Sequence, residues 1–407
     1  MLSLERSGSA PIRVHIGRKD YHRFAAVVAP LATARQNEYD SLCLDMEWDK
    51  VVAVSQLTLN SVSRLRVLSL NVTATDRDHT APVHPAFPCA STLQELTLRL
   101  ISMDTTILDC LRFTSLTVLC LLCTASISQS KALEFLRVSP RLKRVELDLR
   151  RLTTGQTPCP PTVLRDLRQM RIEATTSEDS HLQLFENLIC PVAGDVIISV
   201  QPVFFGRLEV SPFQSSWGFL PRSSKVHTMG LQVRQSYIET IYSIGLLYGE
   251  ASRFEISFRF VAFGTSLSSS NPQEFSVFPE LLRSLRTLTL NSVTRLSITG
   301  INPLTTPFLI KPEVFSSIRE LLTDAENLEI LTISSGCLPA VSQALTPRPT
   351  PPVVRCPRLD SIELLLPTGE GSQNSLAELV VVCKARAIAG YPVRDVSSRS
   401  QAPNSDQ

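Results

Sequence analysis

Hydrophobic residues recur along the chain in a short pattern: an apolar residue, two variable positions, an apolar residue, one variable position and a third apolar residue. Five consecutive copies begin at Leu65, Leu93, Leu116, Leu142 and Leu167, at intervals of 28, 23, 26 and 25 residues. These intervals fall within the ~20–29 residues of leucine-rich repeats, whose strand segment reads L-x-x-L-x-L. Each copy predicts one β-strand, whose alternate apolar side chains face inward.

Weaker copies extend the pattern in both directions, to a total of about twelve or thirteen irregular units. Upstream copies are Ile12-Val14 and Tyr39-Leu42-Leu44, and downstream copies are Val196-Ile198, Met229-Leu231, Phe254-Ile256, Leu328-Leu331-Ile333 and Leu359-Ile362-Leu364. Between residues 285 and 298 two copies compete, Leu285-Leu288-Leu290 and Val293-Leu296-Ile298. They are too close together to be separate repeats, and the pattern does not decide between them.

Several segments between the expected strands show helical periodicity. Helices are expected around Phe135, where Pro140 ends the helix, and over 182–188, 238–247, 314–322 and 376–389. The last of these helices should bury Leu379, Val380 and Cys383. Three segments rich in proline or serine are expected to be irregular loops, namely 79–90, 264–272 and 335–357.

A strand with a single apolar edge is not stable alone, whereas stacked parallel copies bury a continuous core. The sequence therefore predicts an α/β fold of the leucine-rich-repeat solenoid type. In this irregular horseshoe, parallel strands line the concave face and helices or loops form the convex face. The repeat domain should span residues 1–396, and the polar residues 397–407 should form a disordered tail.

Composition and charge argue against several classes of protein. The chain has 57 leucines in 407 residues, about 14%, and only 15 glycines, which excludes wholesale disorder and suits helical connections between strands. Its 40 basic and 38 acidic residues lack the clustered basic excess of nucleic-acid-binding proteins. No apolar run approaches the ~18 residues of a membrane span, and no signal peptide is evident. Ten unevenly spaced cysteines favour reduced thiols, and hence the cytoplasm or nucleus.

No catalytic motif is present, so the chain is not expected to be an enzyme or to hold a cofactor. Phosphate-binding glycine loops, H-E-x-x-H and G-x-S-x-G are absent, and Ser128-Gln129-Ser130-Lys131 lacks the motifs that accompany S-x-x-K in enzymes. Cys120-Leu121-Leu122-Cys123 has no second ligand pair for zinc, and His79, His84 and Cys89 lack a fourth ligand. No metal site is therefore predicted.

The remaining functional candidate is a surface. The variable positions of each strand unit project from the face opposite to the inward leucines, which is the concave face of the expected solenoid. A protein target is expected to dock there, with Cys120 and Leu122 as the apolar centre, although the same charges could simply form a solvated, self-paired ladder. The candidate residues are Glu95, Thr97, Arg99, Cys120, Leu122, Arg144, Glu146, Asp148, Gln169, Arg171, Glu173, Arg253 and Glu255.

The opening segment Leu4-Glu5-Arg6-Ser7-Gly8-Ser9-Ala10-Pro11-Ile12 resembles the stretch that leads into the repeats of F-box/leucine-rich-repeat proteins of mushroom-forming fungi. Phe135-Leu136-Arg137-Val138-Ser139-Pro140-Arg141-Leu142 and the closing Ala387-Ile388-Ala389-Gly390-Tyr391-Pro392-Val393 fit the same pattern. The resemblance covers nearly the whole chain. It implies the substrate-recognition part of a ubiquitin-ligase adaptor.

The resemblance has one departure. In that family an F-box, which docks a Skp-type adaptor, lies upstream of this segment, whereas here Met1 lies three residues before Leu4. We therefore expect a recognition domain without its F-box, which would contact a Skp-type adaptor only if an F-box lies upstream. The alternatives are a remnant or structural leucine-rich-repeat protein without a ligase role and, more distantly, an enzyme with an unrecognised site.

Overall fold

The structure is a computed structural model of the 407-residue chain. It describes residues 12–19, 39–47, 50–51, 65–73, 92–101, 113–153, 160–176, 187–190, 194–202, 226–235, 239–248, 252–261, 290–300, 312–349, 352–366 and 372–400. The chain divides into two compact units. Unit 1 comprises Met1–Phe204 and Gly218–Pro221, and unit 2 comprises Phe205–Trp217 and Arg222–Gln407.

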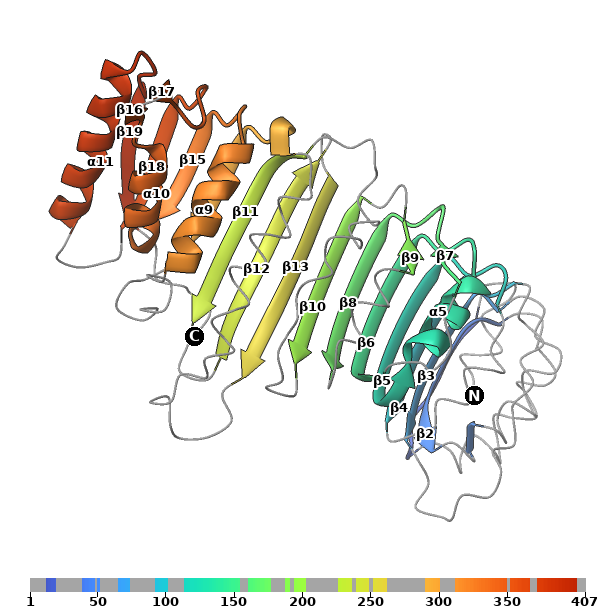
Figure 1. The fold of residues 1–407 in the computed structure, drawn as a ribbon. Helices are drawn as coiled ribbons and strands as arrows, with labels where there is room; N and C mark the ends of the chain where they lie inside the picture. Colours follow the sequence, from blue (N-terminus) through green and yellow to red (C-terminus); the bar gives the residue numbers. More distant parts are fainter. Residues whose placement is uncertain are drawn as a thin grey trace. The chain divides into compact units, whose positions relative to one another are not determined.

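Unit 1 is built on a sheet of eight strands that are parallel throughout (Figure 1). In spatial order they are β1 (Ile12–Ile16), β2 (Tyr39–Glu47), β3 (Val67–Thr73), β4 (Glu95–Ile101), β5 (Val118–Ser128), β6 (Arg144–Thr153), β8 (Gln169–Thr176) and β10 (Asp195–Pro202). A second, two-stranded parallel sheet joins β7 (Thr162–Val163) to β9 (Leu188–Ile189).

The apolar residues of the repeated pattern form the core of unit 1. All three apolar positions of the five consecutive copies are at most 2% exposed, from Leu65-Leu68-Leu70 to Leu167-Met170-Ile172. The strands pair in register, so that Leu96 lies between Leu68 and Leu119, and Val145 lies next along the same row. The prediction of five parallel strands with inward leucines is confirmed, because equivalent residues on neighbouring strands stack on one another.

Helix α5 (Gln129–Arg137) follows β5 directly, as its periodicity predicts. The Ser128 hydroxyl caps the helix by accepting a hydrogen bond from the Lys131 amide at 3.3 Å. Leu133 and Leu136 are buried, and the chain leaves the helix before Pro140. The buried Ser139 hydroxyl donates to the Phe113 carbonyl at 3.1 Å, which ties this turn to the preceding connection.

Unit 2 contains a sheet of mixed direction. Its strands, in spatial order, are β13 (Ser252–Val261), β12 (Glu239–Tyr248), β11 (Val226–Gln235), β14 (Arg295–Thr299), β15 (Ile330–Ser334), β18 (Ser361–Leu366) and β19 (Asp395–Ser400). Strand β12 is antiparallel to both of its neighbours, whereas the pairings from β11 to β19 are parallel. The strands at Met229-Leu231, Leu328-Leu331-Ile333 and Leu359-Ile362-Leu364 are confirmed.

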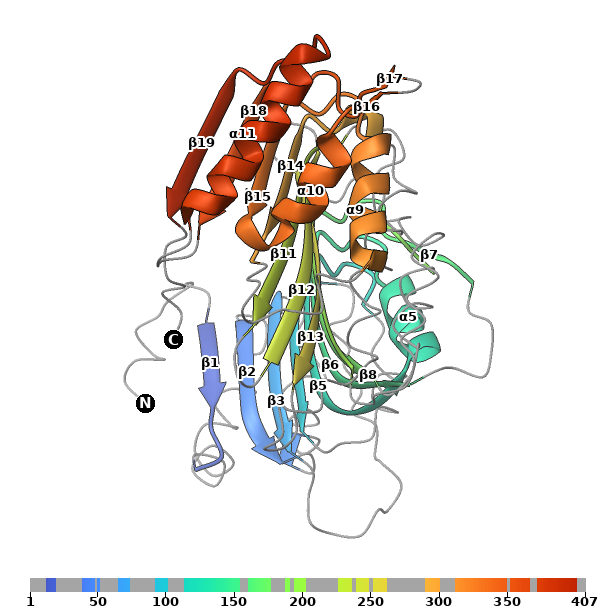
Figure 2. The ribbon, with the colours of Figure 1, turned by 60° about the vertical axis from the view of Figure 1, so that its left-hand side comes forward.

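Three helices cover one face of the parallel strands of unit 2 (Figure 2). They are α9 (Pro312–Asp324), α10 (Leu338–Leu345) and α11 (Ser372–Ile388). The remaining short elements are η6 (Leu290–Ser292), η8 (Ser335–Cys337) and the antiparallel pair β16 (Arg348–Pro349) and β17 (Pro352–Val353). Each helix has a buried apolar side, with Leu321 on α9, Val341 on α10 and Leu379 on α11.

The structure corrects two predictions of local structure. The expected helix over 238–247 is instead strand β12, in which Ile244 and Leu246 are buried and Leu247 is 47% exposed. This alternation has the period of two that is typical of a strand. The isoleucines are also spaced three apart, which is the spacing expected on one face of a helix and which led to the wrong prediction. The segment 335–357 contains helix α10, because Pro339 is tolerated in a first helical turn and the proline-rich run begins only at Pro347.

Two further corrections concern the C-terminal part. In α11, Leu379 is buried as predicted, but Val380 is 45% exposed and Cys383 is only half-buried; Val382 and Arg386 complete the buried face. Residues Ser397–Ser400 pair with β18 as part of β19, so the prediction of a disordered tail is wrong for these four residues. A strand with polar side chains can form when a neighbouring strand satisfies its backbone hydrogen bonds. The polar composition of this segment therefore wrongly suggested disorder.

The competing copies between residues 285 and 298 are now distinguished. Strand β14 carries the second copy, in which Val293, Leu296 and Ile298 are at most 2% exposed. Leu290, the end of the first copy, lies in the 3₁₀ turn η6, and Leu285 and Leu288 lie outside the described residues. The expected loops 79–90 and 264–272 also lie outside them. The chain thus has a mixed α/β architecture with a large parallel sheet.

Candidate protein-binding surface

The candidate residues of unit 1 lie together on one face of its sheet, the face opposite to the buried leucines. We call it the open face. Strand register arranges its side chains in three rows that run across β3, β4, β5, β6, β8 and β10. The rows are Val67–Glu95–Val118–Arg144–Gln169–Asp195, Ser69–Thr97–Cys120–Glu146–Arg171–Ile197 and Asn71–Arg99–Leu122–Asp148–Glu173–Ser199.

Strand β5 forms an apolar stripe through the middle of the open face. Val118, Cys120 and Leu122 are half-buried there. The neighbouring strand β4 carries Glu95 and Arg99, both exposed, and β6 carries charged residues on the other side. Since adjacent strands lie ~4.8 Å apart, an apolar group seated on β5 would be within reach of charged side chains on both sides.

Ion pairs on the open face run along the strands. On β8, the Arg171 guanidinium donates to Glu173 Oε1 from Nη2 at 2.6 Å and from Nε at 3.2 Å. On β6, Arg144 Nη2 lies 3.7 Å from Glu146 Oε2. The hydrogen bond to Glu173 raises the pKa of Arg171, with smaller contributions from Glu173's charge and from two carboxylates on β6. Glu146 and Arg171 lie in register on neighbouring strands, but Arg144 and Arg171 each form the ion pair described above within their own strand.

Cys120 is not an activated nucleophile. Partial burial raises the pKa of its thiol, and the nearby carboxylates of Glu146 and Asp148 raise it further, whereas Arg144 lowers it. The thiol therefore stays protonated at neutral pH, and it contributes a small apolar group to the stripe on β5. The second cysteine of the C-x-x-C motif, Cys123, lies on the same strand, but its side chain is outside the described residues.

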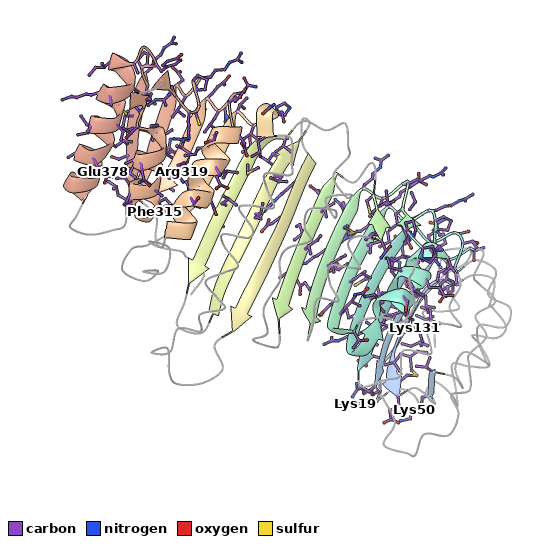
Figure 3. All side chains as sticks on the ribbon, in the orientation of Figure 1. Lys19, Lys50, Lys131, Phe315, Arg319 and Glu378 are labelled. Atoms are coloured by element: carbon purple, nitrogen blue, oxygen red, sulfur yellow. The ribbon has the colours of Figure 1, made fainter. Side chains whose placement is uncertain are left out.

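Two of the candidate residues do not lie on the open face of unit 1. Arg253 and Glu255 lie on β13 in unit 2, where they form an ion pair with each other. Sequence reasoning also passed over residues that share the open face, namely Val67, Ser69, Asn71, Asp195, Ile197 and Ser199. The signal that could have found them is the alternation used for the stronger copies, applied to the strands on either side. Figure 3 shows the side chains carried by these strands.

The described residues contain no group of three or more His, Cys, Asp or Glu side chains that could hold a metal ion. None of the helices within them has the length and apolar composition needed to cross a lipid bilayer. Neither the protein-family models nor the curated proteins compared with the chain match it.

Proposed function

We propose that this chain is a leucine-rich-repeat solenoid that recognises a protein target through the open face of unit 1. The repeat character is supported by five in-register parallel strands that begin 23–28 residues apart, by buried apolar ladders and by the helices that connect some strands. Repeat proteins of this kind present many side chains from successive strands to one partner.

The observation that carries the proposal is the apolar stripe on β5 between charged strands. Protein interfaces combine a desolvated apolar centre with a polar rim, and the open face has this arrangement built into its register. Leu122 and Cys120 supply the centre, whereas Arg99, Arg144 and Glu146 lie on the adjacent strands. The mixed signs of these charges suit a protein partner better than a polyanion such as nucleic acid.

The resemblance of the opening segment to fungal F-box/leucine-rich-repeat proteins extends the proposal. The chain would then be the part of a ubiquitin-ligase adaptor that selects the substrate, in the cytoplasm or nucleus. Coupling to a Skp-type adaptor would need an F-box, so the 407-residue chain should not bind such an adaptor by itself. Direct binding in a purified mixture of the two proteins would contradict this part of the proposal.

The test compares capture of a protein target by the wild-type chain and by variants of the open face. Leu122→Asp and the combined variant Arg144→Glu, Glu146→Arg and Arg171→Glu should each reduce capture at least about tenfold. Arg165→Glu, an exposed charge reversal in the turn before β8, is the matched control and should capture normally. Crosslinks between the target and β4–β6 would locate the contact, and equal capture by all variants would refute the proposal.

The intrastrand ion pairs favour a second candidate, a structural repeat protein with no dedicated ligand. Arg171 is already hydrogen-bonded to Glu173, so part of the charge on the open face is satisfied within the chain. If this candidate is correct, no target will be captured in a manner that depends on Leu122. The same set of variants therefore separates the two functions.

A further inference from the structure

Exposed hydrophobic side chains concentrate at one end of unit 2. Of the seven large hydrophobic residues that are exposed in the described part of the chain, five lie in the final helix and strand or the turn between them. They are Val380 (45% exposed), Val381 (66%), Ile388 (89%), Tyr391 (40%) and Val396 (39%). Single exposed apolar residues are normal on a protein surface, whereas a cluster of this kind marks an interaction site.

The cluster borders a strand with a free edge. Strand β19 ends the sheet of unit 2, and among the described strands it pairs only with β18. Val396 lies in register with the buried Ile362 and faces the same way, toward the helix layer. Its exposure shows that the hydrophobic layer continues to this edge without being covered by another described element. Unpaired strand edges of this kind readily pair with another chain.

We propose that α11 and β19 form the interface of a homodimer, in which a second copy of this chain continues the sheet of unit 2. The two β19 strands would run antiparallel about a two-fold axis perpendicular to the sheet. Because that axis also passes through the helix layer, the two α11 helices would lie antiparallel beside each other. The same patch then serves both copies, as a two-fold interface requires.

The charges on β19 match this arrangement. Asp395 and Arg399 each lie two residues from Ser397, and alternate residues of a strand face the same way. If the pairing is centred on Ser397, each Asp395 lies directly opposite Arg399 of the second copy, and two such pairs form. Residues directly opposite in an antiparallel pair have Cβ atoms ~4.5–5.5 Å apart, within reach of an ion pair.

Both side chains are available for this contact. The Arg399 side chain is 76% exposed, although its Nε also lies 2.7 Å from Glu363 Oε1 on β18. Within the part of the chain that the structure describes, Asp395 accepts a long hydrogen bond, 3.5 Å, from the Ser361 hydroxyl. Guanidinium groups have further donors, so the contact to Glu363 leaves Arg399 able to reach a second carboxylate.

Helix α11 adds apolar surface beside the strand. Val380 and Val381 are exposed on the two flanks of the helix, and Glu378 lies three residues from Val381 (Figure 3 labels Glu378). A stable interface buries ~800 Å² on each partner, which is more than the edge of one six-residue strand provides. The apolar residues of α11 are therefore needed to complete it.

The proposal is tested by sedimentation of the 407-residue chain over a wide range of concentrations. We expect a monomer–dimer equilibrium for the wild type. Val396→Lys should weaken the dimer at least about tenfold, because it places a charge at the apolar edge of β19. Val163→Lys, which changes an exposed valine on β7 of unit 1, is the matched control and should leave the equilibrium unchanged. A wild-type chain that stays monomeric throughout would overturn the proposal.

Charge exchange tests the antiparallel register itself. Asp395→Arg and Arg399→Asp should each weaken the homodimer about tenfold, since both symmetric pairs become like-charged. Mixing the two variants should restore association, because in the heterodimer every position 395 again faces an opposite charge at position 399. Arg394→Asp, an exposed reversal on the same segment, should dimerise normally. Dimers that tolerate both single reversals, or a mixture that fails to associate, would refute this interface.

Discussion

The sheets of units 1 and 2 have similar buried faces and different exposed faces. In both, alternate apolar residues of parallel strands stack in register, as Leu96, Leu119 and Val145 do in unit 1 and Leu296 and Leu331 do in unit 2. These residues are at most 2% exposed in both units. The hydrophobic effect stabilises both sheets, because burying such rows of side chains contributes ~25 cal/mol per Å² of apolar surface removed from water.

The outward faces are different. On unit 1, an apolar stripe on β5 lies between strands that carry paired charges. On unit 2, the middle of the corresponding row is made of small residues: Gly245 on β12 lies opposite Gly230 on β11, and Ser297 and Thr332 follow. Charged residues lie only on either side of this stretch, Glu255 on β13 and Glu363 on β18. A side chain added at Gly245 would meet no atom within 4 Å. The comparison teaches that the inward pattern specifies the sheet and leaves the outward face free to differ, which is why we place recognition on unit 1.

The largest expected effect is on stability, and it should distinguish the buried face of strand β5 from its exposed face. Leu119→Ala removes a fully buried side chain from β5 and should lower the free energy of unfolding by about 3–5 kcal/mol. Leu331→Ala should have an effect of similar size in unit 2, where the residue is equally buried. Leu122→Ala, on the outward face of β5, should cost less than about 1 kcal/mol. Urea denaturation measures all three, and a large loss for Leu122→Ala would break the division between faces.

Alkaline pH should affect the units unequally. Burial raises the pKa of Cys190 in unit 1, and of Cys337 and Cys356 in unit 2, to about 12. An unfolded thiol ionises near pH 9, whereas these folded thiols do not, so stability is complete below pH ~9 and falls as the pH rises toward ~12, by about 1.4 kcal/mol per pH unit for each thiol.

The measurement is the free energy of unfolding against pH for the wild type, Cys190→Ala and Cys337→Ala. Lysines and tyrosines also titrate in this range, so the slope is compared between variants rather than in absolute terms. Each variant should lose less stability than the wild type between pH ~9 and ~11, by about 1.4 kcal/mol per pH unit. Identical slopes would show that these thiols are accessible to water.

Unit 2 also depends on a buried cation that has no counterpart among the described residues of unit 1. Arg386 on α11 is fully buried and donates to the carbonyls of Arg355 and Cys356 at 2.8 and 2.9 Å. Burial lowers its pKa. Arg386→Met would leave both carbonyls without this donor and should destabilise unit 2 by about 1–3 kcal/mol, as measured by thermal or urea unfolding. Arg358→Met, on the exposed surface of the same turn, is the control and should be neutral.

Much of the fold could be predicted because one periodicity dominates it. The triplets that begin at Leu65, Leu93 and Leu116 encode both the strand and its inward face, and the spacing encodes the parallel stack. Strand β12 could not be predicted in this way, because its isoleucines satisfy a helical and a strand period at once. Strand β19 was missed because its polar residues owe their conformation to backbone pairing with β18, which composition does not reveal.

The residues of the candidate site could be predicted as far as the pairing register of the strands could be predicted. Once the leucines are placed, the residues between them must form rows, and Thr97, Cys120 and Glu146 do so. Which charges pair within a row or along a strand depends on side-chain rotamers, and the sequence did not reveal that Arg171 would bond Glu173 two residues away. The position of Arg253 and Glu255 in a separate unit follows from how the chain divides, which no local pattern encodes.

The smallest expected effect concerns the charges of the open face. Arg171 and Glu173 are about half exposed, so their short hydrogen bond should contribute only about 0.5 kcal/mol to stability, and high salt should weaken it further. A double-mutant cycle with Arg171→Gln and Glu173→Gln measures this coupling directly by urea denaturation. A coupling much above 1 kcal/mol would mean that the pair holds the sheet together. A small coupling together with lost target capture by the Arg171 variant would instead assign the pair to recognition, which is the role that unit 1's face has and unit 2's face lacks in our proposal.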